Sequence, residues 1–132
     1  MGEEDKFQYI DRWLGPRLND YNSCLANLEE ACQTADNSAS RPLFERIHAI
    51  DIAQRNWRPY VLQAGWLISA IGEYLEKAEP LGKEASRLVD AAREKMELIS
   101  SERSGLALKV AQLSGLRAEL TEQYLKEEGL LE

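Results

Sequence analysis

One histidine and two cysteines are the residues of this chain whose types most often do covalent or metal chemistry. Cys24 and Cys32 lie eight residues apart in a helical pattern, which is too far along a helix axis for a disulfide between them. Neither has a histidine near it in sequence that would activate it as a nucleophile. We therefore expect two buried thiols in a protein of a reducing compartment, cytoplasmic or nuclear, with no secretory signal peptide.

The histidine, His48, follows Glu45 by three residues. On a helix this spacing puts a carboxylate and an imidazole on one face, as in di-iron bundles, but those sites need two such motifs. A lone helical histidine can also accept a phosphoryl group, although Asp51 and Ile52 stand where histidine-phosphotransfer bundles typically carry Lys and Gly. We expect His48 to be an ordinary residue and keep a histidine-centred regulatory or ligand-sensing bundle as an alternative.

The charge of the chain limits its partners. It has 23 acidic and 16 basic residues and a net charge of −7. An acidic protein repels phosphate backbones and anionic lipid, which argues against nucleic acid and charged membranes as partners. The longest charge-free run, residues 59–72, is too short to span a bilayer. With no Gly-rich phosphate loop and no supported nucleophile, the sequence predicts no enzymatic activity, no cofactor and no metal site.

A repeat of seven dominates the rest of the sequence. Every seventh residue from position 43 to position 120 is apolar, and this period predicts helices that pack side by side along their length. These residues form the ladder: Leu43, Ile50, Trp57, Ala64, Ile71, Ala78, Ala85, Ala92, Ile99, Leu106, Leu113 and Leu120. A companion row lies four residues after ladder positions: Ile47, Val61, Ile68, Leu75, Val89, Met96, Val110 and Tyr124.

The breaks in this pattern predict an all-α fold, an elongated antiparallel three-helix bundle in a single domain over residues 1–132. We expect helices at about 4–34, 41–78 and 83–127, with kinks at Pro16 and Pro59, because an interior proline removes a backbone donor. Between the second and third helices, the Pro and Gly of residues 79–82 predict a tight turn.

The third helix is the longest, about 68 Å against about 45 Å for the first. A turn at residues 100–105 would split it and make a four-helix bundle instead. Ile99 and Leu106 keep the sevenfold spacing across this stretch and no proline is present, so we favour one continuous helix. Its far end would then extend beyond the first helix and need a partner.

The second helix is apolar around much of its circumference, which predicts neighbours on more than one side. Leu62 and Trp66 lie away from the ladder. One interpretation is that the first helix covers them through Trp13, Leu14 and Tyr21. The other is that they form an exposed aromatic anchor, because tryptophan is enriched in binding hot spots.

The sequence favours a non-enzymatic protein–protein interaction module, an adaptor or a subunit of a helical assembly, that binds partner helices through apolar helix faces. A homo-oligomer and an injected or secreted bacterial effector are further alternatives. Arg103 and Arg117, charged residues in the companion row, are expected to set the register of the partner. The candidate interface comprises Leu62, Trp66, Leu98, Arg103, Leu106, Leu108, Val110, Leu113, Arg117, Leu120 and Tyr124.

Overall fold

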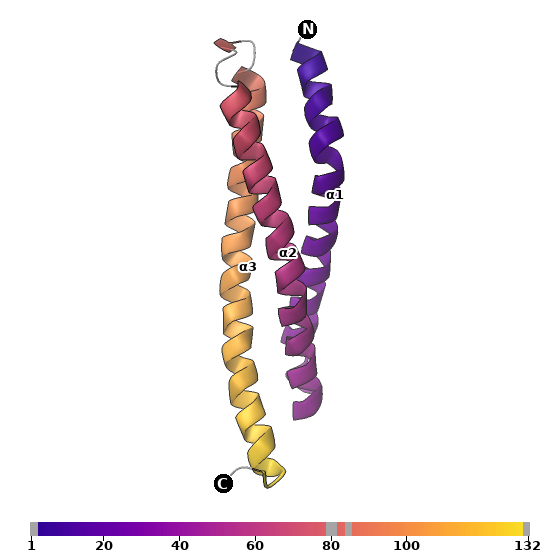
Figure 1. Cartoon of the computed structure of the whole chain (residues 1–132). Coiled ribbons are helices and arrows are strands. Elements are labelled where there is room, and N and C mark those ends of the chain that lie inside the picture. Colours follow the sequence, from indigo (N-terminus) through magenta and orange to yellow (C-terminus); the bar gives the residue numbers. More distant parts are fainter. Residues whose placement is uncertain (1–2, 79–81, 84–85, 131–132) are drawn as a thin grey trace. The chain divides into compact units, whose positions relative to one another are not determined.

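The computed structural model describes residues 3–78, 82–83 and 86–130, and the side chains from residue 15 onward within these ranges. The described chain is all-α, with three helices packed against one another (Figure 1). They are α1 (Glu3–Asp36), α2 (Leu43–Ala78) and α3 (Ser86–Glu127). These bounds confirm the predicted three-helix bundle and differ from the expected ones by at most three residues.

Both interior prolines lie inside continuous helices. Pro16 is within α1 and Pro59 is within α2, so neither ends its helix. The ladder keeps its phase through Pro59 because the packing of the flanking turns holds the helix together after the loss of one backbone bond. The expected kinks at Pro16 and Pro59 stay predictions.

The connection between α1 and α2 is organised by a buried serine. The Ser38 hydroxyl, 2 % exposed, donates to the Ala35 carbonyl oxygen at 2.6 Å. The Arg41 amide in turn donates to the Ser38 carbonyl oxygen at 2.9 Å. These bonds satisfy backbone groups that a helix end leaves without partners, so the polar loop folds tightly against the end of α1.

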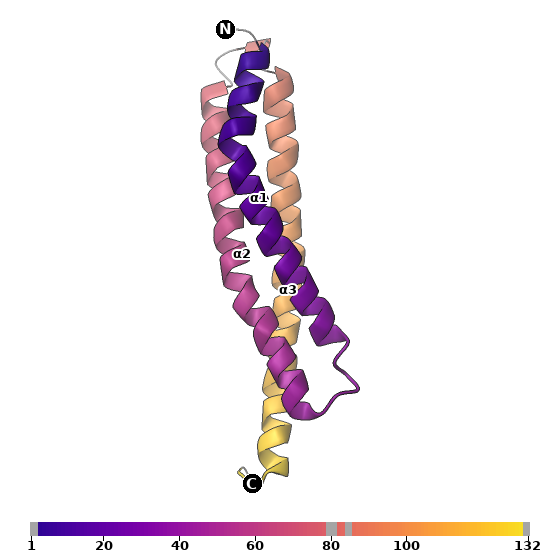
Figure 2. The same ribbon diagram turned by 90° about the vertical axis from the view of Figure 1, so that its right-hand side faces the viewer.

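Contacts within the chain divide it into two compact units, and each unit takes segments from all three helices. Unit 1 comprises Met1–Ser23 and Val61–Ser104, and unit 2 comprises Cys24–Tyr60 and Gly105–Glu132. Within each unit the helix segments lie side by side (Figure 2). The single-domain prediction stays a prediction.

In both units α2 and α3 pack antiparallel. In unit 2 the Phe44 and Tyr124 rings lie 6.2 Å apart, and Gln54 bonds to Arg117, so a later residue on α2 meets an earlier one on α3. In unit 1 Ala78 and Val89 share an apolar cluster with the half-buried Tyr74 and Leu75. An antiparallel pair needs a turn between its helices. Gly82 has a φ of +76°, a left-handed conformation that favours glycine and is typical of turns. Residues 79–81 lie outside the described ones.

Most of the described ladder residues lie in the core. Ile50, Ala64, Ile71, Ile99 and Leu113 are all no more than 4 % exposed. On α2, however, the most buried neighbouring row lies three residues after the ladder, not four. Its members Ala53, Tyr60 and Leu67 are fully buried, whereas the companion-row residues of α2 are only half-buried. A helix that packs against two neighbours buries a face wider than two rows. The row three residues after the ladder is therefore part of the core, although it was not among the predicted rows.

The third helix is continuous through residues 100–105, which confirms the favoured prediction over the four-helix alternative. It ends in a Schellman motif. The Leu130 amide donates to the Leu125 carbonyl oxygen at 2.9 Å, and the Gly129 amide donates to the Lys126 carbonyl oxygen at 3.1 Å. Gly129 has a φ of +74°, as this cap requires. None of the helices, over their described residues, is long and apolar enough to cross a membrane.

Candidate partner-binding surfaces

Among the described side chains of unit 1, Trp66 on α2 is an exposed aromatic. Its side chain is 59 % exposed, and Leu62, one turn earlier, is 53 % exposed. The interpretation that the first helix covers both residues is therefore wrong. Tyr21, which was expected to help cover them, is buried instead, and its hydroxyl donates a hydrogen bond to the Glu102 carboxylate on α3. The side chains of Trp13 and Leu14 lie outside the described ones.

Trp66 is held from one side by a cation. The Arg17 guanidinium of α1 lies 5.6 Å from the centroid of the indole ring, within the range of a cation–π contact. Ring and cation border an open hollow of about 320 Å³, which is also lined by Ser69, Ala70 and Glu73. The result is an apolar ring flanked by one basic and one acidic side chain, the composition of a small recognition patch.

The candidate residues on α3 separate into three groups by exposure. Leu98 in unit 1 and Leu108 in unit 2 are 51 % and 63 % exposed. Arg103, Leu106 and Tyr124 are half-buried. The third group is buried against the chain's own helices, so its side chains are not available to a partner and we remove them from the candidate interface. This group is Val110, Leu113 and Leu120.

Arg117 acts within the chain. Its guanidinium donates to Gln54 Oε1 at 2.8 Å and lies 3.3 Å from Asp51 Oδ1, both on α2. Asp51 also pairs with Arg55 at 2.9 Å. Arg117 thus links α2 and α3 of unit 2, and its expected role in partner register stays a prediction. Its Nε is buried without a hydrogen-bond partner, which lowers the net gain from the pair.

Two charged residues that the sequence analysis did not select lie three residues after ladder positions on α3. In unit 2, Lys109 Nζ pairs with Asp36 Oδ1 of α1 at 2.6 Å. In unit 1, Glu102 accepts the hydrogen bond from Tyr21 of α1. This row therefore faces α1, and the signal that would have found it is the charge recurring at a seven-residue spacing.

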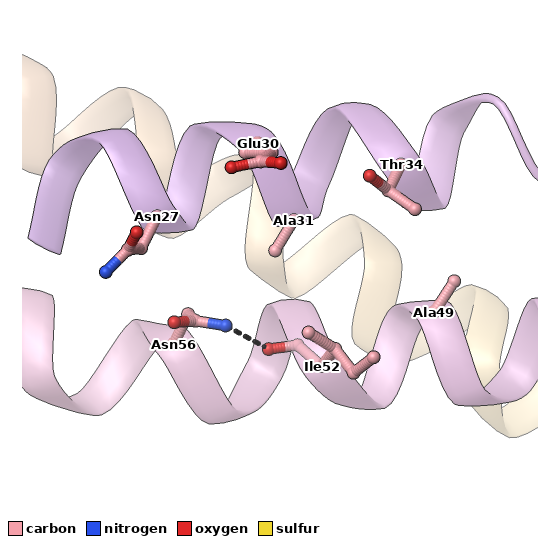
Figure 3. A pocket seen from close by; sticks show the side chains of 7 residues that line it. All are labelled: Asn27, Glu30, Ala31, Thr34, Ala49, Ile52 and Asn56. Carbon is pink, nitrogen blue, oxygen red and sulfur yellow. Dashed lines mark hydrogen bonds between the residues drawn. The ribbon is translucent and has the colours of Figure 1, made fainter.

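A second hollow lies between α1 and α2 of unit 2 (Figure 3). It has a volume of about 300 Å³. Ala31 on α1 and Ala49 on α2 extend toward the space between the helices, and Ile52, 40 % exposed, lies beside it. Asn56 Nδ2 donates to the Ile52 carbonyl oxygen at 2.8 Å, so this amide is already used by its own helix. The sequence analysis missed Ile52 because it lies off both apolar rows.

The histidine motif is at the surface. His48 and Glu45 are both exposed. Among the described residues, no group of three or more His, Cys, Asp or Glu side chains is placed to hold a metal ion. No contact of His48 favours the phosphoacceptor alternative, which stays a hypothesis.

The two cysteines are free thiols in different surroundings. Cys32 is buried as expected, whereas Cys24 is only half-buried. Burial raises the pKa of the Cys32 thiol above its ordinary value. Asp36 and Glu29 raise this pKa further, and Lys109 opposes them. A thiol of raised pKa is mostly protonated at neutral pH and is a poor nucleophile, which argues for a structural role of Cys32.

Comparisons of the chain with models of protein families, with curated proteins and with solved structures found no match. A function can therefore be inferred from the side chains alone. Two places stand out: the exposed Leu62 and Trp66 of α2 in unit 1, and the outer side of α3 around Leu108 in unit 2.

Proposed function

We propose that the chain is a non-enzymatic interaction module that binds a partner helix through the Trp66 patch, defined as Leu62, Trp66 and Ser69 of α2 in unit 1. The observation that carries this proposal is the 59 % exposure of Trp66. Tryptophan is among the residues that contribute most to binding when a partner covers them. The acidic charge of the whole chain disfavours nucleic acid, so the proposed partner is a protein.

The patch lacks charge although the chain does not. The exposed residues of α2 between positions 61 and 72 are the three members of the patch, and the next exposed positions are Glu73, Glu76 and Lys77. The centres of protein interfaces are depleted of charged residues and enriched in aromatic ones, with polar residues at the rim. The Trp66 patch and its border have this arrangement.

Arg17 supports the proposal by limiting the motion of the ring. The cation over one side of the indole holds the side chain against α1 while the rest of it faces solvent. A side chain already held in place loses less conformational entropy on binding. Because Leu62 is 53 % exposed, covering it would add about half of the roughly 1.5–3 kcal/mol that full burial of an exposed leucine gives, and covering Trp66 would add to this.

Site-specific photo-cross-linking in the source cells tests the proposal. A photoreactive amino acid replaces Leu62 in one variant and Glu76 in the control, since both positions are exposed on α2 of unit 1. We expect a discrete protein adduct from position 62, and no such adduct from position 76. The adduct should disappear when Trp66→Ala is added to the position-62 variant.

The same experiment contradicts the proposal in either of two ways. Identical adducts from positions 62 and 76 would show only random encounters along α2. A discrete adduct that persists after Trp66→Ala would show that the patch is not what binds. Every substitution is at an exposed position, so the helices should stay intact. Circular dichroism of each variant checks this.

A further inference from the structure

The outer side of α3 in unit 2 has no charge over four helical turns. Between residues 105 and 118 every exposed residue of α3 is small, polar without charge, or leucine. We call this set the neutral face: Gly105, Leu108, Ala111, Gln112, Ser114, Gly115 and Ala118. In a chain with 30 % charged residues, an exposed helix face of this length normally carries several charges.

The segment itself does contain charged residues, but they lie on its other side. Lys109 pairs with Asp36 of α1, and Arg117 pairs with Asp51 and Gln54 of α2. The charges of this segment thus serve contacts between the helices of unit 2. The exposed residues of this segment form the neutral face. The segment does contain charged residues, but none of them is among its exposed ones.

The shape of the neutral face suits a second helix. Its members recur at intervals of seven, as in Leu108 with Gly115 and Ala111 with Ala118, which makes a straight seam along the helix. Beside the seam lies an open groove of about 500 Å³, lined by Ser114, Ala118, Thr121 and Leu125 together with Gln54 of α2 and the charged Arg117 and Glu122. An open groove is unlike the enclosed cavity that a small ligand requires.

The acidic C-terminal end of α3 indicates that the bound partner is basic. From residue 119 to residue 128 the chain has four glutamates and one lysine. Acidic residues near a helix C-terminus destabilise the helix, because the carbonyl end already has partial negative charge. Glu122 is offset by Lys126 at 3.2 Å, but the net charge of this end stays negative. An acidic end next to an uncharged seam is complementary to a helix with the opposite pattern.

We propose that the neutral face binds a partner helix whose seam of small and apolar residues runs into a cluster of Lys and Arg, with that cluster against Glu119 and the acidic end of α3. This surface lies on a different helix and in a different unit from the Trp66 patch, so it is a second binding site. A second copy of this chain is the competing occupant. The net charge of −7 on each copy disfavours it.

Two synthetic helices serve as probes. Each has about 21 residues, three heptads with Ala and Leu at the seam positions. One ends in four lysines and the other in four glutamates at the same positions. Fluorescence anisotropy with the full chain should give a Kd for the lysine probe that is at least about tenfold lower than for the glutamate probe. The ratio should shrink as salt is raised, because salt screens exposed charges.

A matched pair of variants locates the binding. Ala111→Arg places a long cation on the neutral face, and Ala26→Arg places one on α1 of the same unit, where Ala26 is also exposed. Ala111→Arg should weaken the lysine probe at least about tenfold, and Ala26→Arg no more than about twofold. Glu119→Lys should weaken the lysine probe and strengthen the glutamate probe.

The inference is overturned if both probes bind equally, if neither binds, or if Ala111→Arg weakens binding no more than Ala26→Arg. Light scattering of the unmodified chain decides the competing occupant: a dimer that Ala111→Arg dissociates would place a second copy on the neutral face. Trp66→Ala should leave the Kd of the lysine probe unchanged. A negative result with the probes therefore does not affect the proposal for the Trp66 patch. A negative photo-cross-linking result at the Trp66 patch does not affect the proposal for the neutral face.

Discussion

Between residues 105 and 118, the charged residues of α3 lie beside its buried side and not on its exposed side, the reverse of an ordinary surface helix. The inner side has the buried Val110 and Leu113, and it is bordered by Lys109 and Arg117, which pair with neighbouring helices. The outer side has Leu108 at 63 % exposure and no charge. A surface helix usually directs its charges to water. Here the charged side chains of Lys109 and Arg117 pair with α1 and α2 instead. The outer side therefore has no charge, which is why we propose that it binds a partner.

The corresponding comparison on α2 in unit 1 leads to the same conclusion. Leu67 and Ile71 are fully buried, while Leu62 and Trp66 on the other side are more than half exposed. Apolar residues on both sides of a helix cannot be told apart by composition, although only one side holds the bundle together. We therefore infer that the exposed apolar residues are not needed for folding. The following predictions test that separation.

The largest expected effect is on the inner side. Leu113→Ala should lower the free energy of unfolding by about 2–5 kcal/mol, because it leaves a cavity among buried side chains. Leu108→Ala on the outer side should change it by no more than about 0.5 kcal/mol. Urea denaturation followed by circular dichroism gives both values. Equal losses for the two leucines would remove the distinction between the faces.

A smaller effect is expected from the polar contact between α2 and α3. A double-mutant cycle of Arg117→Ala and Asp51→Ala should give a coupling free energy of about 0.5–1 kcal/mol, since both side chains are partly exposed to solvent. The coupling should fall with added salt. A coupling near zero at low salt would mean that Arg117 does not link the two helices.

An opposite, stabilising effect is expected on the neutral face. Gly115→Ala should raise the free energy of unfolding by about 0.5–1 kcal/mol, because glycine disfavours a helix interior. An added Cβ at this position meets no atom within 4 Å. Leu116, the next residue, is half-buried and serves as a contrast, since Leu116→Ala should destabilise. A loss of stability in Gly115→Ala would show that its surroundings are already filled.

The smallest effect concerns pH. Because burial raises the pKa of Cys32 from an ordinary value of 9.0, the thiol ionises first in the unfolded chain. Its contribution to stability is therefore fully present below about pH 9 and is lost as pH rises through the folded-state pKa. The decline of the free energy of unfolding above pH 9 should be shallower in Cys32→Ala. The same slope in both proteins would contradict a buried Cys32 thiol.

Much of the fold could be predicted because the period of seven is local and repeated. The ladder placed Ile50, Ile71 and Ile99 in the core, and Pro80 with Gly82 indicated the break between α2 and α3. Residues 100–105 were predicted to stay helical from the spacing of the flanking apolar residues and the lack of a proline. Each of these signals lies within one or two heptads of sequence.

The candidate surfaces were harder to predict because exposure depends on which helix lies opposite. Val110 and Leu113 are aliphatic like Leu108, and only the packing of α1 and α2 separates them. The sequence left open whether α1 covers Trp66 or whether the ring is an exposed anchor, and its 59 % exposure, with Arg17 of α1 near the ring, decides for the exposed position. Pairing of Arg117 with Asp51 joins positions 66 residues apart, and no local pattern contains it.

The most direct test of the central claim, that the exposed apolar residues are not needed for folding, is the free energy of unfolding of Trp66→Ala. We predict a loss of no more than about 1 kcal/mol, mainly the cation–π contact with Arg17. A buried tryptophan would instead cost about 3–5 kcal/mol. A loss in that range would contradict the account, because it would make Trp66 part of the core and leave the proposed patch without its anchor.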